Sequence, residues 1–288
     1  MGARVWAPGK VSCVTVVVLT GATRGIGRAA AIELVRRGAE VALVGRDRTR
    51  VRLVAEEAAA VGGRQVHGHV ADLTLMSSVR VLAAEIRERY ERVDVLANNA
   101  GALFGSRGET PEGFERTFAL NHLAPFLLTN LLRDRLAGGR VVTTASNAHK
   151  SGRLILDDLQ SEKSYSARAY GTSKLCNVLF TRELARRAPE LRANCFHPGV
   201  VRTGFAKNED GVWKVVAKVG APFFRSPERG ARSLVWLALS DDAAALTGEY
   251  IVDEKVVTPS AQALDDTLAR SLWERSAQLV SLPIDARG

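Results

Sequence analysis

Short apolar runs alternate with longer amphipathic stretches along most of the chain. The runs typical of strands lie at 14–20, 40–45, 64–70, 93–98, 139–146, 191–196 and 249–252. Helical patterns lie between and after them, at 25–37, 49–61, 75–89, 112–136, 168–187, 227–239 and 262–280. Because the strand runs are rich in Val and Leu on both faces, they indicate a parallel sheet that helices cover on both sides. The alternation predicts an α/β fold with one doubly wound parallel sheet of about seven strands.

The chain is expected to form a single domain, 1–288. Its 288 residues suit one α/β unit, and no long Pro/Gly linker or low-complexity tract divides them. The least regular region is 198–226, which follows the sixth predicted strand and contains Trp213, Phe223 and Phe224. Ligands of open α/β sheets bind at the carboxyl ends of strands, so we interpret 198–226 as a substrate lid. The alternative is an ordinary surface helix.

Composition excludes several classes of function. The formal net charge is +9, but the arginines are spread over helices of mixed charge, which favours solvated faces over nucleic-acid binding. The three Cys residues show no C-x-x-C spacing, which favours buried thiols over a metal site. The apolar run 11–19 is much shorter than the roughly 20 residues of a membrane span. We therefore expect a cytoplasmic protein with no stable membrane insertion, no metal and no nucleic-acid partner.

A glycine-rich loop joins the first predicted strand to the first predicted helix. Glycines let the backbone approach a pyrophosphate, and the helix N-terminus then supplies unpaired N–H groups. This placement predicts a Rossmann-type dinucleotide site, whereas a plain strand–helix turn is the alternative. The candidate cofactor-binding residues of the loop are Gly21, Thr23, Arg24, Gly25, Ile26 and Gly27.

A Tyr and a Lys lie four residues apart on one predicted helix face. A tyrosine hydroxyl can protonate a developing alkoxide, and a nearby ammonium lowers the Tyr pKa from about 10. Tyr170 and Lys174 have this spacing, whereas Tyr165 has no Lys four residues later. Ser146 lies at the carboxyl end of the fifth predicted strand, where it can donate a hydrogen bond to the substrate oxygen beside Tyr170. A surface Tyr–Lys pair is the alternative.

In order along the chain, these motifs resemble the short-chain dehydrogenase/reductase family. After the loop at 20–27 come Asp72-Leu73, Asn98-Asn99-Ala100-Gly101, Asn121, Ser146, Tyr170-Gly171-Thr172-Ser173-Lys174 and His197-Pro198-Gly199. The resemblance implies that Asn121 holds a water near Lys174 and completes a proton relay. It also implies that Lys174 binds the nicotinamide ribose. Further cofactor contacts are implied for Asp72, Leu73, Asn98, Ala100, Gly101, Tyr170, Pro198, Gly199, Val201 and Thr203.

Within the family, the chain is most similar to the retinol dehydrogenase-like and WW-domain oxidoreductase-like branch. The segments that carry this similarity are NHLAPFLLTNLL, DDLQSEKSYSARAY, SKLCNVLFTRELARR and TGEYIVDEK. Relatives often form dimers or tetramers through helices that correspond to 112–136 and 168–187, so the resemblance leaves a homo-oligomer open.

The end of the second predicted strand bears on the choice between NAD and NADP. A carboxylate there binds the ribose hydroxyls of NAD and repels a 2′-phosphate. In this chain Gly45 occupies that position and Arg46 follows it, while Arg24 of the loop adds a second guanidinium. Two guanidiniums suit a phosphate, so we predict NADP(H) as the preferred cofactor and NAD(H) as the lesser one. If the register shifts by two residues, Asp47 becomes the NAD-type acid.

Taken together, the motifs predict an NADP(H)-dependent oxidoreductase, either a ketone or aldehyde reductase or an alcohol dehydrogenase. The apolar residues of 198–226 favour a small apolar carbonyl or alcohol as substrate. An epimerase or dehydratase acting on a nucleotide sugar is disfavoured, because the loop has the spacing Gly-x-x-x-Gly-x-Gly. A non-catalytic NADP(H)-binding sensor or scaffold is disfavoured because the catalytic candidates Asn121, Ser146, Tyr170 and Lys174 are all present.

Overall fold

The computed structural model describes residues 14–163, 165–166, 168–201 and 225–283. Its strands are β1 (Val16–Thr20), β2 (Glu40–Gly45), β3 (Val66–Val70), β4 (Val95–Asn98), β5 (Arg140–Thr144), β6 (Arg192–His197), β7 (Tyr250–Val252) and β8 (Lys255–Val256). Its α-helices are α1 (Gly25–Arg36), α2 (Arg48–Gly62), α3 (Met76–Arg89), α4 (Arg116–Phe118), α5 (Ala124–Leu131), α6 (Arg168–Arg187), α8 (Pro227–Leu239) and α9 (Asp266–Leu279).

The strands form one sheet in the order β3-β2-β1-β4-β5-β6-β7-β8. Every neighbouring pair from β3 to β7 is parallel, and only the β7–β8 pair is antiparallel. The predicted doubly wound parallel sheet is therefore confirmed, with the two-residue β8 as an added edge. Because the strand order reverses between β1 and β4, a crevice is expected at their carboxyl ends.

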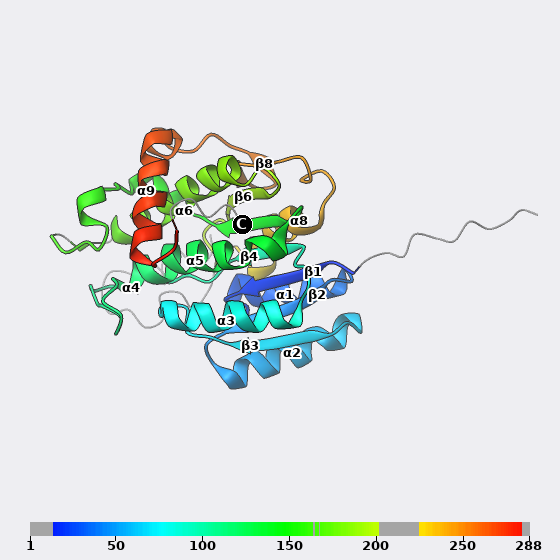
Figure 1. The fold of residues 1–288 in the computed structure, drawn as a ribbon. Coiled ribbons are helices and arrows are strands. Elements are labelled where there is room, and N and C mark those ends of the chain that lie inside the picture. Colours follow the sequence, from blue (N-terminus) through cyan, green and yellow to red (C-terminus); the bar gives the residue numbers. More distant parts are fainter. Residues whose placement is uncertain (1–13, 164, 167, 202–224, 284–288) are drawn as a thin grey trace, which may run out of the picture.

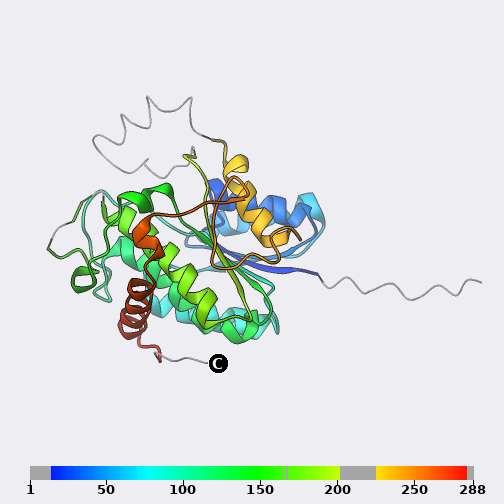
Figure 2. The ribbon, with the colours of Figure 1, turned by 90° about the horizontal axis from the view of Figure 1, so that it is seen from above.

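Helices cover both faces of the sheet, as the all-apolar strands require (Figures 1 and 2). On one face, Leu34 of α1 and Leu234 of α8 pack against strand residues such as Leu43. On the other face, α3, α5 and α6 contribute residues such as Ile86 and Leu179 to the larger cluster. In β1, Val17, Val18 and Leu19 are all inaccessible to solvent, so the first strand lies at the centre of the molecule.

The prediction of one continuous α-helix over 112–136 is wrong. The segment contains α4, a π-helical turn (Ala119–Leu123), α5 and a 3₁₀ turn (Arg133–Leu136). Pro125 lies in the first turn of α5 and has no N–H, so it cannot donate to the carbonyl of Asn121 four residues earlier. The Ala124 N–H instead bonds to the Ala119 carbonyl, five residues back. Pi-helical turns of this kind are frequent at functional positions, and this one contains Asn121.

The predicted helix over 262–280 is divided into a 3₁₀ turn (Ala261–Leu264) and α9, which packs across α6 (Figure 2). Trp273 of α9 stacks on Phe180 of α6, with ring centroids 5.9 Å apart, and meets Phe126 of α5 edge-on at 4.9 Å. These contacts place α9 against both α5 and α6.

Of the predicted lid, 198–226, only 198–201 and 225–226 belong to the described part of the chain. Val201 and Arg225 form an isolated parallel bridge, so the two ends of the segment meet beside the sheet. In the described residues, no helix has the length and apolar character needed to cross a membrane. Cys176 and Cys195 are buried free thiols, whose pKa values burial raises, that of Cys195 to about 12. Cys13 lies outside the described residues.

Candidate active site

The loop between β1 and α1 leaves room for a ligand at the backbone. Gly21 and Gly25 adopt positive φ angles of 65° and 50°, which favour glycine. A Cβ atom at Gly21 would lie 2.7 Å from the Cα of Ala100, so no larger residue fits there. The side chain of Arg24, the N-cap of α1, makes no capping hydrogen bond. The first-turn N–H groups therefore remain available to an anion, which fits a dinucleotide phosphate.

The loop is fastened to the end of β4. The Thr20 hydroxyl accepts from the N–H groups of Asn99 and Ala100, each at 3.0 Å, and donates to the Ala97 carbonyl at 3.2 Å. The Asn99 amide donates to the carbonyls of Thr20 and Gly21, at 3.0 and 3.3 Å. The neighbouring Asn98 amide is buried and donates to Thr129 of α5 at 3.0 Å. Asn99 therefore holds the loop, whereas the Asn98 side chain is directed into the protein.

The two charged candidates that follow β2, Arg46 and Asp47, have different surroundings. Gly45 is buried against Thr23 and Val51, and Arg46 beside it is exposed. Asp47 is the N-cap of α2, where it accepts from the Arg50 N–H at 3.1 Å and lies 3.5 Å from the Arg50 guanidinium. This carboxylate is therefore engaged in capping a helix.

Asp72 and Leu73 follow β3, as predicted. Asp72 Oδ1 accepts from the N–H and hydroxyl of Thr74, at 2.9 and 2.8 Å, which closes a tight turn. Leu73 is 7% exposed and packs in the core beneath this turn.

Ser146 caps a short 3₁₀ helix, η3 (Asn147–Ser151), just beyond the end of β5. Its hydroxyl accepts from the Ala148 N–H at 3.2 Å. Two glycines bring η3 against the first turn of α6. A Cβ atom at Gly171 would lie 2.7 Å from the Ala148 carbonyl oxygen, and one at Gly152 would lie 2.5 Å from that of Gly171. Ser146 therefore reaches Tyr170, which precedes Gly171, because no side chain separates the two helices.

Burial controls the ionisation of Tyr170 and Lys174. Tyr170 is only partly buried as a residue, but burial of its hydroxyl raises its pKa to about 12, against the opposing effect of its hydrogen bond with Ser146. Burial lowers the pKa of Lys174 to about 8, and this side chain is 2% exposed. Its ammonium donates to the Thr144 carbonyl at 2.9 Å and lies 5.6 Å from the centre of the Tyr170 ring.

The prediction that the Tyr170 pKa is lowered is therefore wrong, because burial raises it. Loss of water around the phenol is the largest influence on this pKa, and the Lys174 ammonium donates its hydrogen bond to the main-chain carbonyl of Thr144.

Asn121 is fully buried and connects three parts of the site. Its Oδ1 accepts from the Ala102 N–H at 2.9 Å, and its Nδ2 donates to the Ala102 carbonyl and to the Ser173 hydroxyl, both at 2.9 Å. Ser173 in turn donates to the Tyr170 carbonyl at 2.7 Å. A Cβ atom at Gly101 would lie 3.1 Å from Asn121 Oδ1 and 3.4 Å from Lys174 Nζ, so the segment after β4 passes close to both groups.

The segment after β6 starts at the same edge of the sheet. Pro198 and Gly199 directly follow β6, and Gly199 adopts a φ angle of 83° against the side chain of Arg225. Val201 pairs with Arg225, and Thr203 lies outside the described residues.

Sequence reasoning missed several groups that the fold brings to the site. Ser173 was not predicted as a site residue, yet it joins Asn121 to Tyr170. The Thr144 carbonyl receives both Lys174 and the Asn177 amide, at 2.9 and 3.2 Å. Spacing along α6 places Ser173 and Asn177 near Tyr170 and Lys174, but their partners are distant in sequence. Tyr165 is structural here, since its hydroxyl donates to the Phe104 carbonyl at 2.7 Å.

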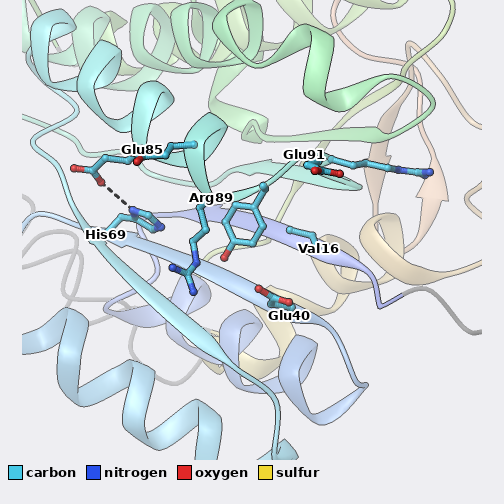
Figure 3. Close-up of a pocket in the computed structure, with 9 residues that line it drawn as sticks. Val16, Glu40, His69, Glu85, Arg89 and Glu91 are labelled. Carbon is cyan, nitrogen blue, oxygen red and sulfur yellow. Dashed lines mark hydrogen bonds and ion pairs between the residues drawn. The ribbon is translucent and has the colours of Figure 1, made fainter.

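A large cavity of about 760 Å³ lies elsewhere, at the amino-terminal ends of β1 and β2. Figure 3 shows Val16 and Glu40 at these strand ends, and Glu85 of α3 facing His69 of β3. Glu85 Oε2 lies 2.9 Å from His69 Nδ1. Residues at its rim include Glu85 and Arg89, which are exposed and of opposite sign. We place the candidate active site at the other edge of the sheet, because the glycine loop, Ser146 and Tyr170 gather there.

The chain is similar to a known family and to several known proteins. The family described as short chain dehydrogenase matches residues 15–211. A protein of Streptomyces sp. (strain C5), provisionally assigned as a daunorubicin C-13 ketoreductase, is 46% identical over 92% of this chain and 92% of its own length. Human retinol dehydrogenase 13 is 39% identical, over 96% of this chain and 86% of its own. The Pseudomonas aeruginosa RhlG/NADP active-site complex superposes with a TM-score of 0.68 at 26% identity, covering 83% and 95% of the two chains.

The close contact between η3 and α6 generates a prediction. Gly171→Ala should lower kcat by about 10- to 100-fold, because the new methyl group pushes Ser146 away from Tyr170, and small misplacements at a reacting centre cost rates of this order. Arg168→Ala, an exposed change in the same helical turn, is the control and should leave kcat unaltered. Steady-state kinetics on both variants measure this. A wild-type kcat for Gly171→Ala would show that the contact does not set the geometry.

Proposed function

This chain belongs to the short-chain dehydrogenase family, and we propose that it reduces apolar aldehydes or ketones with NADPH, using Ser146, Tyr170 and Lys174. Membership makes the protein an oxidoreductase that acts on CH–OH or C=O groups. The observation that carries the rest of the proposal is the convergence of Ser146 and Tyr170 beside the buried Lys174, next to a loop that suits a dinucleotide phosphate.

The proposed cofactor site lies along the carboxyl ends of β1, β2 and β4. The first-turn N–H groups of α1 would bind the pyrophosphate, with Gly21 allowing its close approach. The turn at Asp72 and Leu73 would lie against the adenine, and Lys174 would bind the nicotinamide ribose. When bound, the nicotinamide supplies or accepts the hydride.

The preference for NADP(H) is supported by the charges after β2. Arg46 is exposed, and among the described residues no carboxylate pairs with it. Arg24 is exposed at the start of α1, in the loop that faces the same edge of the sheet. Asp47 is the acid that the NAD-type alternative requires, but its carboxylate already caps α2. A 2′-phosphate would therefore be attracted by the guanidiniums of Arg24 and Arg46, while the Asp47 carboxylate is engaged at the N-terminus of α2.

The proposed chemistry follows from the protonation states in the site. With a pKa of about 12, Tyr170 is protonated at neutral pH and can donate its proton to the oxygen of a carbonyl that is being reduced. Ser146 would donate a second hydrogen bond to that oxygen and stabilise its negative charge. Lys174, with a pKa of about 8, is largely an ammonium at neutral pH and favours the tyrosinate left after transfer.

Asn121 would complete the return of the proton from solvent through its main chain. Its side chain is fully used in bonds to Ala102 and Ser173. Its carbonyl has lost the usual donor four residues later, because that residue is Pro125. We propose that this carbonyl accepts from a water near Lys174.

An apolar substrate fits the side chains on the segments that flank the site. Ile155, which follows η3, is 49% exposed, and Val200, which follows β6, is 61% exposed. Exposed apolar side chains on the segments that follow η3 and β6 suit a ligand that buries them. The names of the relatives, a daunorubicin ketoreductase and a retinol dehydrogenase, are consistent with apolar carbonyl and alcohol substrates.

Replacement of the proton donor tests the catalytic assignment. Tyr170→Phe should lower kcat for reduction of decanal or acetophenone by about 10²- to 10⁴-fold, the usual contribution of a general acid. NADPH affinity, followed by nicotinamide fluorescence, should change little because the ring remains. Turnover close to that of the wild type would remove Tyr170 from the mechanism.

Replacement of Arg46 tests the cofactor assignment. Arg46→Ala should weaken NADPH binding by about 10- to 100-fold, because a hydrogen bond between charged groups contributes about 1.5–3 kcal/mol. NADH affinity should stay nearly constant. Arg52→Ala on the exposed face of α2 removes the same charge outside the site and should leave both affinities unchanged. Equal losses for the two cofactors in Arg46→Ala would return the question to Asp47.

A further inference from the structure

We propose that His149 is a positioning residue that holds Ser146 in place by joining it to the segment before α9. The inference rests on the proposed role of Ser146 in the reaction. His149 lies three residues after Ser146 in η3, and its side chain is inaccessible to solvent. It does not bind the substrate or the cofactor in this proposal.

Both ring nitrogens of His149 are bonded to the main chain. Nδ1 lies 2.7 Å from the Ser146 carbonyl oxygen, which also accepts from the His149 N–H at 3.0 Å. Nε2 accepts from the Ser260 N–H at 3.1 Å. The imidazole therefore connects two segments that are 111 residues apart in sequence.

These two partners fix one tautomer of the ring. A carbonyl oxygen can only accept, so Nδ1 must carry the proton, whereas the Ser260 N–H can only donate, so Nε2 must be unprotonated. An imidazolium would direct a second N–H at the Ser260 N–H. Burial acts in the same direction and lowers the His149 pKa below its usual value, which outweighs the opposing effect of the bond to the Ser146 carbonyl.

Asn147, the residue after Ser146, is hydrogen-bonded to side chains of two strands. The Asn147 N–H donates to His197 Nδ1 of β6 at 3.2 Å, and Asn147 Oδ1 accepts from the Tyr250 hydroxyl of β7 at 2.9 Å. The Tyr250 ring also packs edge-on against His149, with centroids 4.8 Å apart. All these bonds reach η3 from the side of β6, β7 and the C-terminal segment.

Such support matters because Ser146 lies beyond the end of β5, at the start of a short helix. β5 ends at Thr144, and η3 is a five-residue 3₁₀ helix, a form with poor hydrogen-bond geometry. The Ser146 hydroxyl is bonded locally to the Ala148 N–H, so its direction follows the main chain of the turn. The His149 bond to the Ser146 carbonyl fixes that main chain from within the core.

Two amide substitutions separate the two bonds of His149. The side-chain amide of Asn reaches about as far as Nδ1, so His149→Asn can still donate to the Ser146 carbonyl but cannot reach Ser260. The amide of Gln reaches about as far as Nε2, so His149→Gln can accept from Ser260 but leaves the Ser146 carbonyl without its side-chain donor. Each variant of the full-length protein thus retains one bond and loses the other.

We expect kcat for decanal reduction to stay within about threefold of wild type in His149→Asn and to fall by about 10- to 100-fold in His149→Gln. Thermal unfolding should show a similar decrease in Tm for both, since each loses one buried bond. NADPH affinity should be unchanged in both, because neither substitution alters the loop between β1 and α1 or Lys174. A purely structural role predicts instead that kcat follows Tm and falls equally in the two variants.

Equal kcat values for the Asn and Gln variants, whether both low or both like the wild type, would overturn the proposal. Ser146→Ala, measured in parallel, separates this failure from failure of the proposed function. If Ser146→Ala is inactive while the two His149 variants are alike, only the positioning role is wrong. If Ser146→Ala turns over like the wild type, the role of Ser146 itself is wrong and the inference falls with it.

Discussion

The candidate active site depends on the contact between η3 and the first turn of α6. Gly152 and Gly171 let the two main chains approach so closely that a single methyl group at either position would collide with a carbonyl oxygen. The Thr172 hydroxyl strengthens this contact by bonding to both the N–H and the carbonyl of Arg153, each at 3.2 Å. Ser146 and Tyr170 come from elements separated by a long connection, and this contact brings them together. Functional groups elsewhere in the site are arranged around that pair.

Burial sets the pKa values of Tyr170 and Lys174. The phenol of Tyr170 and the ammonium of Lys174 are both removed from water, which raises one pKa to about 12 and lowers the other to about 8. At neutral pH these two shifts favour a protonated phenol beside a mostly charged amine. This is the state needed before a carbonyl is protonated, and it needs no prior ionisation of Tyr170.

The sequence was sufficient for features that are local or periodic. The β1 loop, the four-residue spacing of Tyr170 and Lys174, and the parallel sheet follow from patterns within a few residues. The π-helical turn around Asn121 was missed, although Pro125 is its visible signal. The Tyr170 pKa and the bonds of His149 could not be predicted, because they depend on burial and on partners such as Ser260 that only the tertiary structure brings near.

We propose that hydride transfer to a carbonyl takes place at the carboxyl ends of the strands, beside Ser146 and Tyr170. The most direct measurement uses NADPH deuterated at the transferable position of the nicotinamide, incubated with the wild-type protein and an apolar ketone, with mass spectrometry of the alcohol product. We expect one deuterium on the carbinol carbon and an excess of one product enantiomer. Tight NADPH binding without deuterium in the products of any apolar aldehyde or ketone tested would contradict it, and would favour a cofactor-binding protein without this activity.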